Sequence, residues 1–576
     1  MRKSSVTSRL FVLMAATHLF PLAPPALAQT DLHFEQQKLT AIDALGGSSF
    51  GFSVAVRGNR AIVGAPRADG AGNQSGSASV FRASPIHALW LQESKLTASD
   101  AATEDQFGYS VAVFGDWAVV GARKDDDGGN NSGSAYIFRR DDKGTPSDPS
   151  DDAWIEATKL TASDAGANDE FGYSVSMSGK RIVVGARFDN DVASSSGSVY
   201  VFRREDKGTP SDPGDDVWIE ETKLTASDAE GGETFGSAVS IGKDRIVVGA
   251  QFADTPGGIG SGAAYVFRVD DNGTTADLSD DVWFEEAKLT ASGSSNQFGR
   301  AASISGDRVL VGAQNNSAYV FRLDNSGTPQ NPDDDGWVQE AKLVASDAAE
   351  AAEFGYSVAL SGDRALVGAL FGNAPWAADS GAAYFFRRDD NGTPADPDDD
   401  LWIQETKLIA SDASFTDFLG FSVALSGGRA IAGAPFDAAM GAGSEAGTGS
   451  AYAYTVSEDV PAGQVPDGNG VAGLPLVLNR ETDGSIQLSW GDSCSEDDTD
   501  YEIYEGILGN FASPVPLVCS TGGLTTESFV PAAGDTFYLV VPNNGFREGG
   551  YGVDSAGNPR PLPVNTCLPQ SIGSCE

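Results

Sequence analysis

Hydrophobic and polar positions alternate along most of this chain in short runs, and the same runs return again and again. One unit contains an alternating run such as Gly108–Val113, a tight turn, and an apolar run that ends in Val-Gly-Ala. Two further runs complete it, such as 133–139 and 218–224. Alternation with a period of two residues predicts strands with one buried and one exposed face. No long 3.6-residue pattern appears, so we expect an all-β fold with four short strands in each unit.

The dipeptide Phe-Gly marks the start of six units, and Leu-Gly marks a degenerate seventh. The marks begin at Phe50, Phe107, Phe171, Phe235, Phe298, Phe354 and Leu419. Antiparallel four-stranded units repeated at this period are typical of propeller blades. We therefore predict a seven-bladed β-propeller over residues 29–460.

The strand count predicts how the ring closes. Fourth-strand sequences open with Trp in six units, while the last unit ends at 451–454 with no fourth strand after it. The segment Leu32–Leu39 has the fourth-strand pattern, with Phe34 in place of Trp, and precedes the first Phe-Gly. We expect it to pair with residues near 450–455, because an unpaired sheet edge invites aggregation.

The repeat resembles a known family. Phe-Gly followed by Gly-Ala-Pro, complete at Gly64–Pro66 and Gly433–Pro435, is similar to the FG-GAP repeat of integrin α-subunit propellers and their bacterial relatives. The resemblance covers all seven units and implies a propeller that serves as a binding platform. In that family, calcium sits in an Asp-x-Asp-x-Asp-Gly type loop between the first two strands of some blades. Here that turn is too short to supply six or seven oxygens, so those sites are not carried over.

Acidic residues gather instead between the third and fourth strands. Closely spaced carboxylates beside a Gly turn suit calcium, and two copies of this loop are the candidate sites. The alternative is a solvated connector in which Gly, Pro and Asp serve their backbone preferences. The candidate calcium ligands are Asp389, Asp390, Asp396, Asp398 and Asp400 in one copy and Asp141, Asp142, Asp148 and Asp151 in another.

The N-terminal segment 1–28 is expected to be a cleaved signal peptide. Its basic residues precede an apolar stretch, and Ala26-Leu27-Ala28 fits the small-x-small cleavage pattern. The mature chain is then secreted or displayed at the cell surface, in the periplasm or beyond it. No later segment is apolar enough to span a bilayer, so membrane insertion is not expected.

After a linker at 461–471 the pattern changes. Alternating runs such as 485–490 and 536–541 in segment 472–576 resemble a fibronectin type III-like β-sandwich. All the cysteines of the chain lie here, an even number in an exported chain, which predicts two disulfides. Three pairings are possible, and proximity favours Cys494 with Cys519 and Cys567 with Cys575.

Composition narrows the function. The net charge of −43 would repel nucleic acid and anionic lipid. Only three histidines occur, one of them in the signal segment, so His-dependent catalysis and zinc chemistry are not expected. We expect a monomeric, non-catalytic binding or adhesion protein for an extracellular protein or glycan. The alternatives are a hydrolase or lyase acting on polysaccharide through paired carboxylates, and a structural envelope protein.

Three local features bear on a binding role. The Phe of Phe-Gly and the Trp of the fourth strands repeat in nearly every unit, which indicates packing between blades. Trp376 breaks this pattern and is a candidate contact residue on an exposed loop. The loop at Gln314–Asn316 of the fifth blade is very short and is expected to leave a notch in the rim.

Overall fold

The structure is a computed structural model of the full chain. It describes residues 34–455, apart from 44–45, 71, 85–88, 144–151, 206, 208–213, 273–277, 293–296, 315, 325–334, 348–351, 392–396 and 439–446, together with six strands between residues 477 and 543. The signal-like segment, the linker and all four cysteines lie outside the described residues. Signal cleavage and the disulfides therefore stay predictions.

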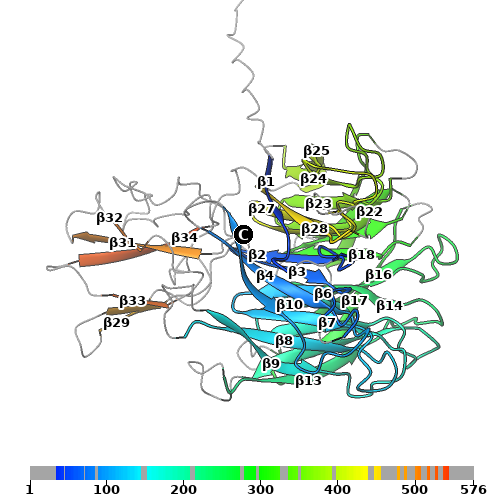
Figure 1. Ribbon diagram of the computed structural model, residues 1–576, viewed down its shortest axis with the longest axis horizontal. Helices are drawn as coiled ribbons and strands as arrows, with labels where there is room; N and C mark the ends of the chain where they lie inside the picture. The colour runs from blue at the N-terminus through cyan, green and yellow to red at the C-terminus, as the bar shows by residue number, and fades with distance from the viewer. Residues whose placement is uncertain are drawn as a thin grey trace, which may run out of the picture.

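Seven four-stranded antiparallel sheets form the blades of one ring (Figure 1). Blade 1 has β2 (Ser53–Arg57), β3 (Arg60–Ala65), β4 (Ser77–Ala83) and β5 (Trp90–Leu96). Blade 2 has β6 (Phe107–Phe114), β7 (Trp117–Ala122), β8 (Ser134–Asp141) and β9 (Ala153–Leu160). Blade 3 has β10 (Phe171–Ser178), β11 (Arg181–Ala186), β12 (Ser198–Glu205) and β13 (Val217–Leu224).

The remaining blades repeat this layout. Blade 4 has β14 (Phe235–Ile241), β15 (Arg245–Ala250), β16 (Ala263–Asp270) and β17 (Val282–Leu289). Blade 5 has β18 (Ala301–Ser305), β19 (Arg308–Ala313), β20 (Ser317–Asp324) and β21 (Gly336–Leu343). Blade 6 has β22 (Phe354–Ser361), β23 (Arg364–Ala369), β24 (Ala382–Asp389) and β25 (Leu401–Leu408), with the 3-10 turn η2 (Pro397–Asp399) before β25.

Blade 7 is assembled from both ends of the propeller. It has β26 (Ser422–Ser426), β27 (Arg429–Ala434), β28 (Ser450–Thr455) and, as its fourth strand, β1 (Phe34–Leu39). β1 runs antiparallel to β28, with Phe34 opposite Thr455 and Leu39 opposite Ala451. The predicted ring closure is confirmed, and it covers the edge of β28 that would otherwise be open.

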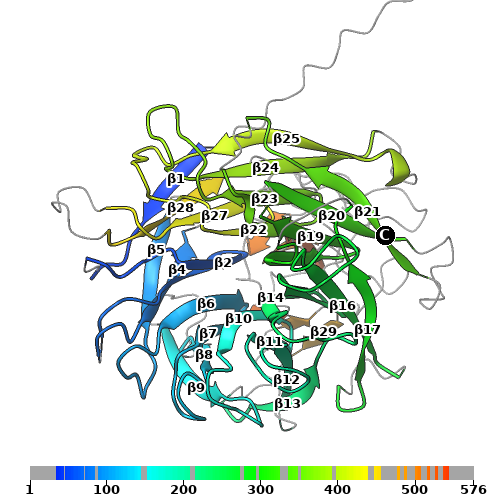
Figure 2. The same cartoon turned by 90° about the vertical axis from the view of Figure 1, so that its right-hand side faces the viewer.

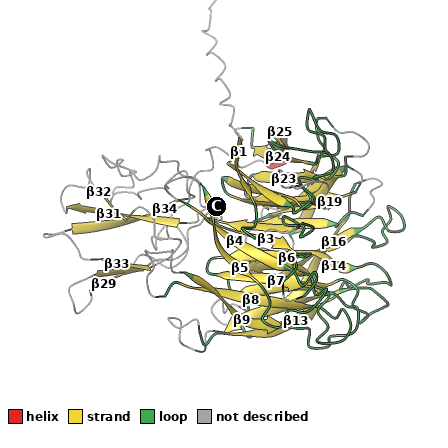
Figure 3. Ribbon diagram, in the orientation of Figure 1, coloured by secondary structure: helices red, strands yellow, loops and turns green. Residues whose placement is uncertain are grey.

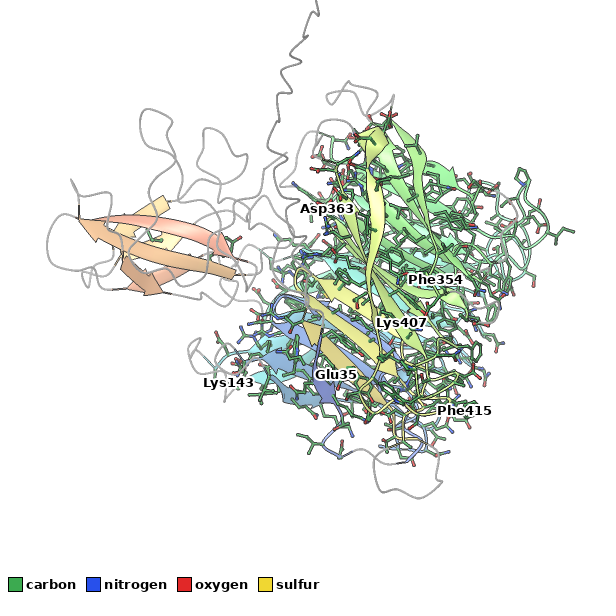
Figure 4. All side chains as sticks on the ribbon, turned by 90° about the horizontal axis from the view of Figure 1, so that it is seen from above. Glu35, Lys143, Phe354, Asp363, Lys407 and Phe415 are labelled. Atoms are coloured by element: carbon green, nitrogen blue, oxygen red, sulfur yellow. The ribbon has the colours of Figure 1, made fainter. Side chains whose placement is uncertain are left out.

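The two sides of the ring differ. Figure 2 looks onto the ring, with first strands such as β2, β6 and β10 toward the centre and fourth strands such as β9, β13 and β25 at the periphery. We call the side formed by the loops after second and fourth strands the loop face, and the other side the turn face. Long loops gather on the loop face (Figure 3). Phe415 lies toward this face in Figure 4, whereas Lys143 and Asp363 lie toward the turn face.

The core lies between blades rather than within them. Each of the seven hydrophobic clusters draws on two neighbouring blades, as where Val119 and Ile137 of blade 2 pack with Phe171 and Val184 of blade 3. Second strands such as β11 are buried along their whole length, which fits their continuous apolar sequence. Burial of this kind is the main source of stability in a chain of repeats.

The repeated aromatic residues pack as predicted. Phe107 is fully buried, and the centre of its ring lies 5.4 Å from that of Tyr136 and 5.9 Å from that of Phe138, both edge-on. Trp154 is 9% exposed and donates a hydrogen bond from Nε1 to Glu93 of the preceding blade, at 2.9 Å. Edge-on aromatic pairs add stability beyond their buried area.

Adjacent blades meet backbone to backbone at glycine. A Cβ atom on Gly121 of blade 2 would overlap the carbonyl oxygen of Gly172 in blade 3, and the Gly of every Val-Gly-Ala mark faces its neighbour in the same way. Ser110 Oγ donates to that Gly172 oxygen at 2.8 Å. A second glycine, Gly133 with φ 83°, forms a parallel bridge to Phe171. The glycines therefore set how closely the blades approach.

The C-terminal segment contributes two small antiparallel sheets. One has the order β29 (Val477–Arg480), β30 (Ile486–Ser489), β33 (Thr526–Phe529), and the other β32 (Val515–Val518), β31 (Asp500–Ile507), β34 (Thr536–Asn543). Leu488 and Ile503 are fully buried. The strands are as expected for an all-β module, while its likeness to fibronectin type III stays a prediction. Among the described residues, no helix has the length and apolar character needed to cross a membrane.

We predict that Gly121→Ala lowers the free energy of unfolding by on the order of 3 kcal/mol, because the new methyl group displaces the backbone of the next blade. Gly115→Ala is the matched control. Gly115 has a positive φ, 57°, unlike Gly121, but a Cβ added at Gly115 has no atom within 4 Å, so this control carries backbone strain of about 1 kcal/mol without a clash between blades. Urea unfolding of residues 29–576 followed by tryptophan fluorescence measures both. Equal losses in the two variants would show that the blades do not depend on this approach.

Candidate functional site

Seven side chains surround the propeller axis at the loop face. Each is the residue after the Phe-Gly or Leu-Gly mark, and it is either the third residue of an innermost strand or the residue just before one. We call this set the axial collar; its members are Phe52, Tyr109, Tyr173, Ser237, Arg300, Tyr356 and Phe421. All seven line one pocket of about 380 Å³, together with Arg187, Gln251, Phe252 and Gln297. This volume lies in the range of small-molecule sites in proteins, roughly 300–1,000 Å³.

A left-handed turn delivers each collar residue to the axis. The residue before Phe-Gly has a positive φ in every blade, for example 59° at Gln106 and 55° at Glu170. The Gly that follows Phe also has a positive φ, such as 89° at Gly108. Non-glycine residues adopt this conformation at a cost, which the contacts between blades must offset. The seven entries to the first strands are thus fixed in one backbone shape.

Five collar residues form a continuous aromatic arc through blades 6, 7, 1, 2 and 3. The ring centres of Tyr356 and Phe421 are 5.1 Å apart, and those of Phe421 and Phe52 are 4.8 Å apart. Phe52 and Tyr109 are also separated by 4.8 Å, and Tyr109 and Tyr173 by 5.1 Å. Ser237 and Arg300 interrupt the arc in blades 4 and 5. The pocket therefore has one aromatic side and one polar side.

Arginines stack on the tyrosines of the collar. Arg187 lies 3.8 Å from the ring centre of Tyr173, and Arg123 lies 4.1 Å from that of Tyr109. Glu170 joins the two guanidinium groups, accepting hydrogen bonds from Arg187 Nε at 2.8 Å and Arg123 Nη1 at 3.2 Å. Such stacking holds a guanidinium group flat against the ring with its charge retained.

Arg300 occupies the polar side of the collar. Its guanidinium group is 3.9 Å from the ring centre of Tyr356, and its Nη1 is 3.8 Å from Glu353, longer than a hydrogen bond. Burial raises the pKa of Tyr356, and it raises that of Tyr109 well above the usual value for a phenol. Both hydroxyl groups therefore stay neutral at physiological pH.

The electrostatics of the pocket differ from those of the whole chain. Arg123, Arg187 and Arg300 carry three positive charges around it, and Glu170 and Glu353 carry two negative charges, which leaves an excess of one positive charge. No carboxylate is among the described residues that line the pocket. The whole chain has a net charge of −43. The pocket is a local exception that can accept an anionic group.

The sequence held a signal for this site that was not used. Within each repeat most positions are constant, but the residue after Phe-Gly and the residue after Gly-Ala vary. The second position is Pro66 and Pro435 in two blades, but Arg123, Arg187 and Gln251 in blades 2, 3 and 4. These positions vary between blades because they face the axis, whereas the constant positions form the contacts between neighbouring blades.

The predicted calcium ligands that the structure describes lie on the turn face, away from this pocket. Asp400 is paired with Arg388 at 2.8 Å and with Arg308 at 3.3 Å, and Asp398 is paired with Arg322 at 2.9 Å. The side chain of Asp389 accepts a hydrogen bond from the backbone of Asn391. The structure describes Asp390 but not Asp396, so this loop is seen only in part.

The other copy of the loop is seen in part as well. Asp141 pairs with Lys143 at 2.5 Å, and Asp142 is described beside it. Asp148 and Asp151 lie outside the described residues. Arginine or lysine neutralises the carboxylates of Asp141, Asp398 and Asp400. Calcium binding in these loops stays a prediction.

A different group of carboxylates comes together on the loop face. Asp164 follows a fourth strand, and Asp189 and Asp191 follow a second strand; their oxygens lie within 4.8 Å of one another. Lys223 Nζ sits among them, 2.7 Å from Asp164 and 2.9 Å from Asp189, and also contacts Asp191. The hydroxyl oxygen of Tyr200 lies 2.6 Å from Asp164 and 2.7 Å from Asp189, within reach of either carboxylate for its one hydrogen bond. Blade 2 repeats the arrangement around Lys159.

Lysine thus serves as an internal cation in these clusters. Burial alone would lower the pKa of Lys223, but hydrogen bonds to Asp164, Asp191 and Asp189 outweigh burial and raise it. The ammonium group stays charged and neutralises part of the surrounding negative charge. A buried carboxylate group without such a partner would be costly.

Further exposed aromatic residues lie on loops of the loop face, and one of them, Phe436, contacts the collar. The ring centre of Phe436 is 6.4 Å from that of Phe421 and 5.4 Å from that of Phe418. Trp376 is 60% exposed, as expected, and Phe415 is 67% exposed. The loop between β19 and β20 spans only 314–316, so blade 5 has the short rim that was predicted.

Comparison with known proteins agrees with the architecture. The sequence model described as FG-GAP repeat matches residues 34–81, 90–138, 154–202, 218–267, 283–328, 337–386 and 402–454, one match to each repeat. Together these segments cover more than half of the chain. A search of curated proteins finds no match.

We predict that Lys223→Met destabilises the propeller at pH 7 in the presence of a chelator, because three carboxylates are left close together without their cation. Calcium should restore part of the loss, since these oxygens can then hold a metal ion. Lys288→Met is the matched control, because Lys288 pairs with a single carboxylate, that of Asp228. Thermal unfolding with and without calcium measures both. A calcium effect of equal size in the two variants would contradict this account of the cluster.

Proposed function

Because the chain belongs to the FG-GAP repeat family, we propose that it is an exported, non-catalytic binding protein that holds an extracellular partner at the axial pocket of its loop face. The observation that carries the proposal is the axial collar. Aromatic and arginine side chains converge there on a pocket of ligand size. Concave, mostly aromatic sites with a few placed polar groups are typical of binding sites.

The rigid backbone that holds the collar residues favours a role in ligand binding. Collar side chains stand at the entries to strands whose backbone is clamped between neighbouring blades. A site built on such a frame loses little conformational entropy when a ligand binds. The constant frame and variable collar also allow different members of one fold to take different ligands.

The same residues weigh against the carboxylate-based hydrolase or lyase. Glycoside hydrolysis needs two carboxyl groups that flank the scissile bond, roughly 5–10 Å apart. The described lining of the pocket has none, and the carboxylate of Glu170 nearby is engaged by two arginines. A purely structural envelope role would not require a pocket lined in this way. The role in adhesion is a part of the proposal that rests on the family resemblance, whereas calcium assistance rests on the acidic loops between third and fourth strands.

The test is to close the pocket without disturbing the fold. Gln251→Trp fills space inside the lining, and Lys243→Trp places the same side chain in the same blade on the exposed turn between β14 and β15, at the turn face. The mature chain, residues 29–576, is applied to immobilised glycans and extracellular proteins. We expect at least a tenfold loss of binding for Gln251→Trp and none for Lys243→Trp. Equal binding by both variants would place the partner elsewhere.

A further inference from the structure

The two sides of the axial pocket differ in what they can bind. The aromatic arc already has an arginine stacked on each of its three tyrosines, and it ends where Ser237 and Arg300 begin. The exposed ring of Phe252 in the lining offers a flat face that suits the apolar face of a sugar ring. On the polar side, Gln251 and Gln297 add amide groups that can both donate and accept hydrogen bonds. A ligand that satisfies both sides has a ring-shaped body and several hydroxyl groups.

The arginines specify an anionic group on that ligand. Arg187 uses Nε to bind Glu170, and no hydrogen bond from its two Nη atoms to another described residue is seen. Arg300 is held by stacking on Tyr356, with its carboxylate neighbour at 3.8 Å. A planar guanidinium group held with free donors is suited to a carboxylate, which it can bind through two parallel hydrogen bonds.

Charge limits the number of anionic groups. The arginines and glutamates around the pocket leave an excess of one positive charge, within a chain of net charge −43. One carboxylate is attracted over the short distances inside the pocket. A polyanion would also meet the repulsion of the whole molecule, because potentials of this size extend about 8 Å in physiological salt.

We propose that the axial pocket binds a single carboxylated sugar ring carried on an otherwise uncharged glycan. This inference rests on the proposed function and names its ligand class. The carboxylated ring stacks on Phe252, and exposed Phe436 beside Phe421 offers a stacking face for a neighbouring sugar of the same chain. Hydroxyl-binding amides beside stacking faces favour a sugar over a peptide carboxylate.

The probe is a matched pair, methyl β-D-glucuronide and methyl β-D-glucoside, which differ only in the carboxylate. Saturation-transfer NMR on residues 29–576 should give the glucuronide at least a tenfold lower Kd than the glucoside. Arg187→Gln and Arg300→Gln should each remove most of this preference. Arg67→Gln is the control, because Arg67 is an exposed arginine on the loop face outside the lining.

Other outcomes would overturn the inference in distinct ways. Tighter binding of N-acetylphenylalanine than of the glucuronide would assign the pocket to a peptide carboxylate. Affinity that rises steeply with the number of uronate residues in a short oligomer would assign it to a polyanion. Equal Kd values for the glucuronide and the glucoside in the unaltered chain would show that the pocket does not recognise the carboxylate.

The proposed function is tested separately. If the glucuronide fails to bind while Gln251→Trp still abolishes binding of another immobilised partner, the ligand class is wrong and the binding role stands. If Gln251→Trp changes the binding of no partner and of no sugar, both the ligand class and the binding role of the pocket are wrong. The variant Arg300→Lys gives a further check. It keeps the positive charge but loses the paired N–H donors, so it should also weaken glucuronide binding.

Discussion

The close approach of neighbouring blades along their backbones is the constraint on which the rest of this structure depends. Two glycines per blade make it possible, as where Gly121 faces the carbonyl of Gly172 and Gly133 bridges to Phe171. This contact brings the apolar faces of adjacent sheets together, so that the core forms between blades. It also accounts for the recurrence of the glycines in the sequence, because a side chain at either position would separate the blades.

The same constraint creates the candidate site. A backbone clamped in seven repeated turns presents seven side chains to the axis, where five of them pack on one another as the aromatic arc. Tyr173 and Arg300 stand at equivalent positions in different blades, yet one supplies a stacking face and the other a charge. The blades thus share one backbone structure, while the side chains that line the pocket differ from blade to blade.

Much of the fold could be predicted from the sequence, because repetition shows the blade before any contact is known. The count of Trp-led strands identified Leu32–Leu39 as the closing strand, and β1 pairs with β28 as that count required. Burial of Phe107 and its counterparts also followed from their recurrence. These features depend on local alternation and on period, which the sequence displays directly.

The site was not predicted, for a physical reason. Collar residues such as Phe52 and Phe421 are distant in the chain and meet only because the ring closes. The register between β12 and β13 places Lys223 opposite Tyr200, and loops from two blades bring the carboxylates to it. The acidic runs between third and fourth strands lie on the turn face, whereas the variable residues of the repeat lie at the axis. The sequence shows that these residues vary, but only the closed ring shows that they surround one pocket.

The most direct measurement of the central claim is a crystal structure of the mature chain grown with methyl β-D-glucuronide. The account predicts one sugar ring in the axial pocket, stacked on Phe252, with its carboxylate within hydrogen-bonding distance of Arg187 or Arg300. An empty collar with the sugar bound elsewhere on the propeller, or a sugar in the pocket with its carboxylate turned away from both arginines, would contradict it.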